Sequence, residues 1–138
     1  MLHHQHIVIR SHVNKPPQST ELIETWLKDL IQAIDMKILC GPYSIYLDKE
    51  GNRGLTAVAV IETSHIALHV WDESSPSLFQ LDVYSCKEFN KQTVFEKLAQ
   101  FEPVDVERII CPIGIINKLD CHLLNLLFVK ISLLQLRL

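Results

Sequence analysis

The hydrophobic pattern of the chain changes its period from two to about 3.6 within the first thirty residues. A short β-branched run at residues 6–12 is typical of a strand, and the Asn-Lys-Pro-Pro segment after it can belong to neither a helix nor a central strand. Beyond Ser19, apolar residues recur at spacings of one, three and four: Leu22, Ile23, Trp26, Leu27, Leu30, Ile31 and Ile34. This spacing predicts an amphipathic helix whose first turn carries acidic residues suited to the helix dipole.

The middle of the chain is predicted to be mostly strand. Residues 37–47 are β-prone but are interrupted by Gly41-Pro42, which favours a bent or edge strand. A segment rich in turn formers, residues 48–54, follows this run. Beyond it come three more β-prone runs: 55–62, 65–71 and 78–86. The short connections between them predict three neighbouring antiparallel strands.

Two further elements complete the predicted domain, which we expect to span residues 1–112. Apolar residues at helical spacing predict a helix over 93–101, and residues 104–111 alternate enough for one more strand. The predicted fold class is therefore α+β: a two-layer sandwich in which an antiparallel sheet carries helices packed on one face.

Residues 113–138 form a Leu-rich C-terminal tail of unknown role. Its apolar runs are far shorter than the ~18–20 residues that a membrane span requires. We expect a helix that packs on the sheet or on a partner subunit, with an interfacial helix as the alternative.

Composition narrows the class of protein. The chain has 138 residues, 48% of them hydrophobic, and a net charge of -3, which indicates one folded domain and argues against nucleic acid as a partner. Its four cysteines form no C-x-x-C pair, so we expect no metal site. Without a basic and apolar leader, a cytoplasmic location and free thiols are expected.

Candidate chemistry lies in residues 65–71. The strand period of two places His65, His69 and Trp71 on one face, away from the apolar face that would meet the helices. A solvated or dimer-covered face would explain this pattern, but the adjacent Ser64 raises the possibility of a nucleophile beside a base. Cys86 ends the next predicted strand, where it is either close to that face or a small buried hydrophobe.

A resemblance to a known family adds a reaction. The pattern Ser-His-x-x-x-His-x-Trp-x-Glu begins at Ser64, and Asp-Val-Tyr-x-Cys begins at Asp82. Together with the run from Gly54 onward, these motifs resemble the prokaryotic and phage-encoded S-adenosylmethionine decarboxylases over roughly residues 5–110. The resemblance implies a proenzyme that cuts itself before a serine, which becomes a pyruvoyl cofactor. That carbonyl forms a Schiff base with the substrate amine and accepts electrons during decarboxylation.

The resemblance also implies roles for individual residues. Those expected to act are Ser64 as pyruvoyl precursor, His69 as processing base, Cys86 as catalytic proton donor, Thr56 in place of a processing serine, and Trp71 and Glu73 near the substrate. The chain departs from the family at Thr63, where a glutamate is usual before the cleaved bond. It departs again in the loop 51–54 and in the tail beyond Pro112.

The implied function is decarboxylation of S-adenosylmethionine for spermidine synthesis by a homodimer of processed protomers, in the cytoplasm or, for a phage-encoded protein, the host cytoplasm. Two alternatives stay open. A pyruvoyl-dependent ornithine or arginine decarboxylase would have the same reactive centre and a different pocket. A homologue that does not cleave would act as a binding or regulatory partner.

Overall fold

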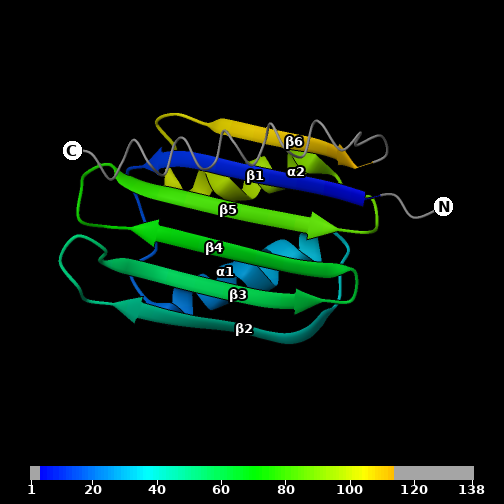
Figure 1. The fold of residues 1–138 in the computed structure, drawn as a ribbon, viewed down its shortest axis with the longest axis horizontal. Coiled ribbons are helices and arrows are strands. Elements are labelled where there is room, and N and C mark those ends of the chain that lie inside the picture. Colours follow the sequence, from blue (N-terminus) through cyan, green and yellow to red (C-terminus); the bar gives the residue numbers. More distant parts are fainter. Residues whose placement is uncertain (1–3, 114–138) are drawn as a thin grey trace.

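The computed structural model describes residues 4–113, which form a six-stranded antiparallel sheet in the order β2-β3-β4-β5-β1-β6. Both helices lie on the same side of this sheet (Figure 1). The elements are β1 (His4–Val13), α1 (Thr20–Ala33), β2 (Ile38–Leu47), β3 (Gly54–Ile61), β4 (Ser64–Trp71), β5 (Ser77–Ser85), α2 (Lys91–Leu98), a 3-10 turn (Ala99–Phe101) and β6 (Glu107–Ile113). The predicted α+β fold with helices on one face is confirmed.

The order of strands agrees with the sequence pattern in its main features. The bent run that contains Gly41-Pro42 is an edge strand, β2, and it pairs irregularly with β3 around Cys40. The three neighbouring antiparallel strands are β3, β4 and β5. Strand β6 forms the other edge and begins at Glu107, three residues later than predicted, because Val104 and Val106 are exposed in the preceding loop.

Helix α1 begins where its capping residue predicts. The Ser19 hydroxyl accepts a hydrogen bond from the Leu22 amide at 3.2 Å, which satisfies one of the free N–H groups of the first turn. Leu22 itself is 58% exposed, so its assignment to the apolar stripe was wrong. It lies one step of about 100° from Ile23, which is where the buried stripe begins.

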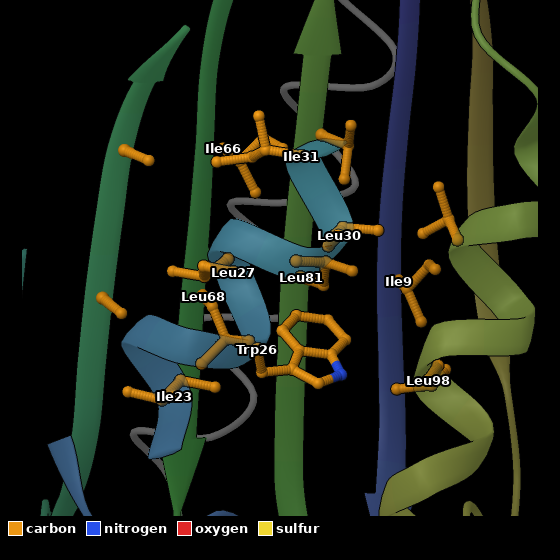
Figure 2. Close-up of a cluster of buried hydrophobic side chains, with 14 of the residues drawn as sticks. Ile9, Ile23, Trp26, Leu27, Leu30, Ile31, Ile66, Leu68, Leu81 and Leu98 are labelled. Carbon is orange, nitrogen blue, oxygen red and sulfur yellow. The ribbon is translucent and has the colours of Figure 1, made fainter. Parts of the chain in front are cut away.

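The core lies between the helices and one face of the sheet. In Figure 2, side chains of α1 such as Leu27 and Leu30 meet Leu68 of β4 and Leu81 of β5, while Leu98 of α2 lies beside Ile9. Each such side chain contributes roughly 1.5–3 kcal/mol when fully buried. This packing determines which face of β4 is turned toward the helices, and therefore which of its residues lie on the opposite face.

The second face of the sheet carries the predicted chemistry, and we call it the open face. Along β4, Ile66, Leu68 and Val70 are buried, while His65 is exposed and Ala67, His69 and Trp71 are half-buried. Neither described helix covers the open face (Figure 1). The predicted separation of the two faces of β4 is confirmed.

Some predictions fall beyond this description. Residues 114–138, which make up all but the first residue of the predicted Leu-rich tail, lie outside the described residues. Among residues 4–113, no helix is long and apolar enough to cross a bilayer.

Candidate active site

The residues singled out from the sequence lie in two groups at opposite ends of β4, and the structure adds Asn52 to one of them. We call Thr63, Ser64, His65, Tyr84 and Cys86 the cleavage cluster, since it surrounds the bond before Ser64. The second group, which we call the pocket cluster, consists of Thr56, His69, Trp71, Glu73 and Asn52.

The cleavage cluster begins with an unusual backbone conformation. Ser64, the first residue after the tight β3–β4 turn, has a φ of 154°. Side-chain-bearing residues rarely adopt such angles, which cost of the order of 1–3 kcal/mol. The Ser64 hydroxyl lies 3.2 Å from Nδ1 of His65. A strained serine and an imidazole are therefore in hydrogen-bond contact.

The peptide carbonyl before Ser64 is also held. The Thr63 carbonyl oxygen accepts a hydrogen bond from the backbone N–H of Cys86 at 2.9 Å. The Thr63 side chain points toward the core, with its hydroxyl 3.0 Å from that of Ser85 and 3.1 Å from the Met36 sulfur. The β4–β5 register produces this arrangement, because it pairs Ser64 with Ser85.

Two aromatic rings stand beside the strained serine. The same register places Tyr84 directly opposite His65, with ring centroids 5.8 Å apart. The Tyr84 hydroxyl is in turn hydrogen-bonded to Nδ1 of His4 at 2.9 Å. The tyrosine of the Asp-Val-Tyr-x-Cys motif therefore packs against the histidine that follows the serine.

Cys40 and Cys86 are free thiols. Cys86 is half-buried and lies one residue beyond the end of β5, next to the held carbonyl. Its backbone N–H contacts the Thr63 carbonyl, while the approach of its thiol to the face of His65 and His69 stays a prediction. Among the described residues, no group of three His, Cys, Asp or Glu is placed to hold a metal ion.

The pocket cluster lies beside a cavity of about 300 Å³, which Asn52, Thr56, His69 and Trp71 help to line and Glu73 does not. The Thr56 hydroxyl is 3.1 Å from Nδ1 of His69, and the imidazole stacks on the Trp71 indole with centroids 5.7 Å apart. Burial lowers the pKa of His69 below its ordinary value, although the Asp82 carboxylate opposes the shift. His69 is therefore neutral near pH 7, as a proton acceptor must be.

The two residues predicted to bind substrate also hold the loop between β2 and β3. The Trp71 indole N–H donates to the Asn52 side-chain oxygen at 2.9 Å, and the Glu73 carboxylate accepts from the Gly51 N–H at 2.7 Å. Asn52 lines the pocket, which sequence reasoning missed because only the loop as a whole stood out. The loop joins β3 at Gly54, where an added Cβ would lie 1.8 Å from the Val70 carbonyl oxygen.

One predicted pair does not meet within the chain. Ser64 and His69 are five residues apart on the same extended strand, which corresponds to about 17 Å at ~3.3 Å per residue. Ser64 contacts His65 instead, and His69 contacts Thr56. A single copy of residues 4–113 therefore contains the parts of a processing site without bringing serine and predicted base together.

Comparison with known proteins places these residues in a family. The family model of S-adenosylmethionine decarboxylase matches residues 10–108, a segment that holds both clusters. The S-adenosylmethionine decarboxylase proenzyme of Methanococcus aeolicus is 29% identical over 93 residues, which are 62% of this chain and 74% of the relative. The proenzyme of Methanococcus maripaludis is 33% identical over 66 residues, 48% of this chain and 49% of the relative.

A solved structure shares the fold. The adenosylmethionine decarboxylase from Aquifex aeolicus superimposes with a TM-score of 0.58 at 20% identity, covering 84% of this chain and 94% of that chain. The family model alone spans more than half of the sequence, including the serine, both histidines and the cysteine of the two clusters. The chain belongs to the S-adenosylmethionine decarboxylase family.

Proposed function

We propose that the chain is a proenzyme that cuts itself between Thr63 and Ser64 and then decarboxylates S-adenosylmethionine. The main observation behind this proposal is the set of contacts and the backbone strain around the Thr63–Ser64 peptide bond. Its carbonyl accepts an N–H from Cys86, and its serine is strained and paired with an imidazole. An ordinary turn residue needs none of these features.

The cleavage chemistry follows from the residue types. Attack of the Ser64 hydroxyl on the Thr63 carbonyl converts the amide into an ester. Removal of the Ser64 Cα proton then expels the Thr63 carboxylate and leaves dehydroalanine. Its imine tautomer takes up water and releases ammonia, which yields a pyruvoyl group at the start of residues 64–138. That group supplies the electron sink for decarboxylation.

The base for the elimination step is His69 of a second copy. A two-fold axis between two facing open faces, crossing β4 near Ala67, would place each Ser64 against His69 of the partner subunit. Such an interface is self-complementary, so that both sites are completed at once. Ser64 and His69 are roughly 17 Å apart within one chain, on either side of the axis, and this spacing lets each residue meet the other one of the partner subunit.

Exposed apolar residues on the open face support the same dimer. Tyr43 and Ile45 of β2 are 64% and 67% exposed, and they pair in register with Val58 and Thr56 of β3. Val60 follows on the same face at 45% exposure. A contiguous apolar area beside polar catalytic residues is typical of an interaction surface.

Residues of both clusters fit the decarboxylation itself. The Cys86 thiol supplies the proton to the carbon that loses carbon dioxide. The Trp71 indole offers a face to the sulfonium or the adenine of the substrate. The Glu73 carboxylate, which accepts the Gly51 N–H through one oxygen, would accept hydrogen bonds from ribose hydroxyls through the other. The family model and both proenzyme relatives favour S-adenosylmethionine over ornithine or arginine as the substrate.

The test is release of carbon dioxide from three carboxyl-labelled substrates: S-adenosylmethionine, ornithine and arginine. We expect the wild-type protein to release label from S-adenosylmethionine, and the Ser64→Ala variant to release none. Release from ornithine or arginine alone would contradict the substrate assignment. No release from any of the three would favour the homologue that only binds.

A further inference from the structure

The first step of cleavage needs a base that His69 does not provide. The Ser64 hydroxyl must lose its proton as it attacks the Thr63 carbonyl, a step that precedes removal of the Cα proton. We propose that His65 accepts this hydroxyl proton and is thus the catalytic base of the acyl shift. This inference rests on the proposed self-cleavage and assigns one of its steps.

The contact geometry supports His65. Its Nδ1 lies 3.2 Å from the Ser64 oxygen, at the outer limit of hydrogen-bond reach, where pairs often tighten as reaction begins. The side chain is exposed on the open face, so the core does not orient it. Tyr84 does so instead, since its ring lies opposite in register at 5.8 Å and its hydroxyl is anchored to His4.

Neighbouring groups are engaged elsewhere. The Asp82 carboxylate, on the same face of β5 as Tyr84, is 2.9 Å from Nε2 of His6. The Thr63 hydroxyl points toward Ser85 and Met36, on the core side. His65 is therefore the described titratable group that both touches the nucleophile and is free to take its proton.

The step balances without an outside reactant. His65 must carry its own proton on Nε2, which leaves Nδ1 as the acceptor. As the bond from the Ser64 oxygen to the Thr63 carbonyl carbon forms, the hydroxyl proton moves to Nδ1. The carbonyl oxygen gains negative charge, and the Cys86 N–H that already faces it at 2.9 Å stabilises that charge. When the C–N bond breaks, the imidazolium returns the proton to the Ser64 nitrogen.

The two histidines of the motif then have different tasks. His65 acts within its own chain on the hydroxyl proton, and His69 of the partner subunit acts on the Cα proton. The consequence can be measured, because loss of His65 blocks ester formation whereas loss of His69 blocks ester breakdown. Hydroxylamine distinguishes the two, since it cuts an ester and leaves the amide intact.

The experiment follows cleavage of freshly purified His65→Gln and His69→Ala on denaturing gels, with and without hydroxylamine. Removal of a general base costs about 10²- to 10⁴-fold in rate, so we expect His65→Gln to stay full length at least 10²-fold longer than wild type. It should also resist hydroxylamine. His69→Ala should stay full length but be cut by hydroxylamine between Thr63 and Ser64.

Two controls keep a structural effect apart from a catalytic one. In His65→Ala, added imidazole should restore cleavage. Free imidazole can replace a missing base, but it cannot refold a misfolded chain. The matched variant His12→Gln removes another imidazole from the same face of the sheet, on β1, one that contacts Asp105 and not Tyr84, and should cleave at the wild-type rate. Thermal melting of His65→Gln should stay close to wild type, because the described contacts of the His65 side chain are with Ser64 and Tyr84 and not with the core.

Wild-type-like cleavage of His65→Gln would overturn the assignment of His65 and leave the proposed function intact. An ester that accumulates in His65→Gln would also overturn it, since the acyl shift would then proceed without this imidazole. A wild-type chain that never cleaves would overturn the proposed function as well, and the two failures are therefore distinguishable.

Discussion

At the scale of single residues, Cys86 contributes two groups to the site. Its backbone N–H holds the Thr63 carbonyl, and its half-buried thiol, which forms no disulfide, is the proposed proton donor of the later step. A side-chain substitution removes the second group and keeps the first. Cleavage and turnover should therefore respond differently to the same variant.

We expect Cys86→Ala to cleave at close to the wild-type rate and to release carbon dioxide at least 10-fold more slowly, the loss expected for a general acid being about 10²-fold or more. Some cycles should protonate the wrong carbon and inactivate the pyruvoyl group by transamination. Cys40→Ala, which removes an exposed free thiol from β2, is the control. Normal turnover of Cys86→Ala would make the thiol a structural group.

The environment of His69 predicts a pH dependence. Because burial lowers its pKa below the ordinary 6.5, the folded chain binds this proton less readily than the unfolded chain does. His69 stays a competent base through pH 7, and its neutral state is lost only at pH below 6.5. The same shift makes the folded state less stable as the pH falls below 6.5.

An NMR titration of the uncleaved Ser64→Ala protein measures this directly. The His69 ring should titrate below pH 6.5, and coverage of the open face by a second copy should lower the midpoint further. A midpoint at or above 6.5 would show that His69 is not desolvated as the structure describes.

At the scale of elements, the β2–β3 loop borders the pocket through Asn52. Glu73 and Trp71, just beyond and at the end of β4, hold it through Gly51 and Asn52. The loop thus covers one side of the pocket without contributing to the cleavage cluster at the far end of the strand.

We expect Glu73→Ala to cleave normally and to show at least a fivefold higher KM for S-adenosylmethionine, since it loses both a substrate contact and the acceptor for the Gly51 N–H. Glu50→Ala removes an exposed carboxylate from the same loop and should leave KM unchanged. Equal KM values for the two variants, measured by carbon dioxide release, would place Glu73 outside the substrate site.

Strand periodicity made much of this site predictable. Alternation within residues 65–71 correctly assigned both faces of β4, because an antiparallel sheet with helices on one side has a buried and an unburied face. Alternation carries no information about register. The pairing of Ser64 with Ser85, and hence the Cys86 contact with the Thr63 carbonyl, emerged only in three dimensions.

The sequence motif also could not show which histidine contacts Ser64. A motif shows that Ser64 and His69 occur together, but an extended strand keeps them about 17 Å apart. The adjacent His65, which the pattern placed on the open face without a role, is the one in contact.

At the scale of the whole molecule, the proposed processing requires two copies of the chain. A mixed dimer shows whether His69 acts on Ser64 of its own chain or on Ser64 of the partner subunit. When Ser64→Ala and His69→Ala chains with different tags are produced together, the mixed pair has one site that combines an intact Ser64 with His69 of the partner subunit. The His69→Ala chain should then be cleaved in the mixed pair and remain uncut alone.

The Ser64→Ala chain should stay full length in every combination, which provides the internal control. If the His69→Ala chain remains uncut in a mixed dimer verified through both tags, the proposed exchange of His69 between subunits is wrong. Elution of the active wild-type protein as a 15.9 kDa monomer would lead to the same conclusion.

Self-cleavage between Thr63 and Ser64 is the central claim, and intact mass spectrometry of the wild-type protein after long incubation tests it most directly. The account predicts two fragments, residues 1–63 with a free carboxylate and residues 64–138 with a pyruvoyl group at the N-terminus. Reduction with borohydride should add two hydrogens to the second fragment only. A single species that stays at the full 15.9 kDa would contradict the account.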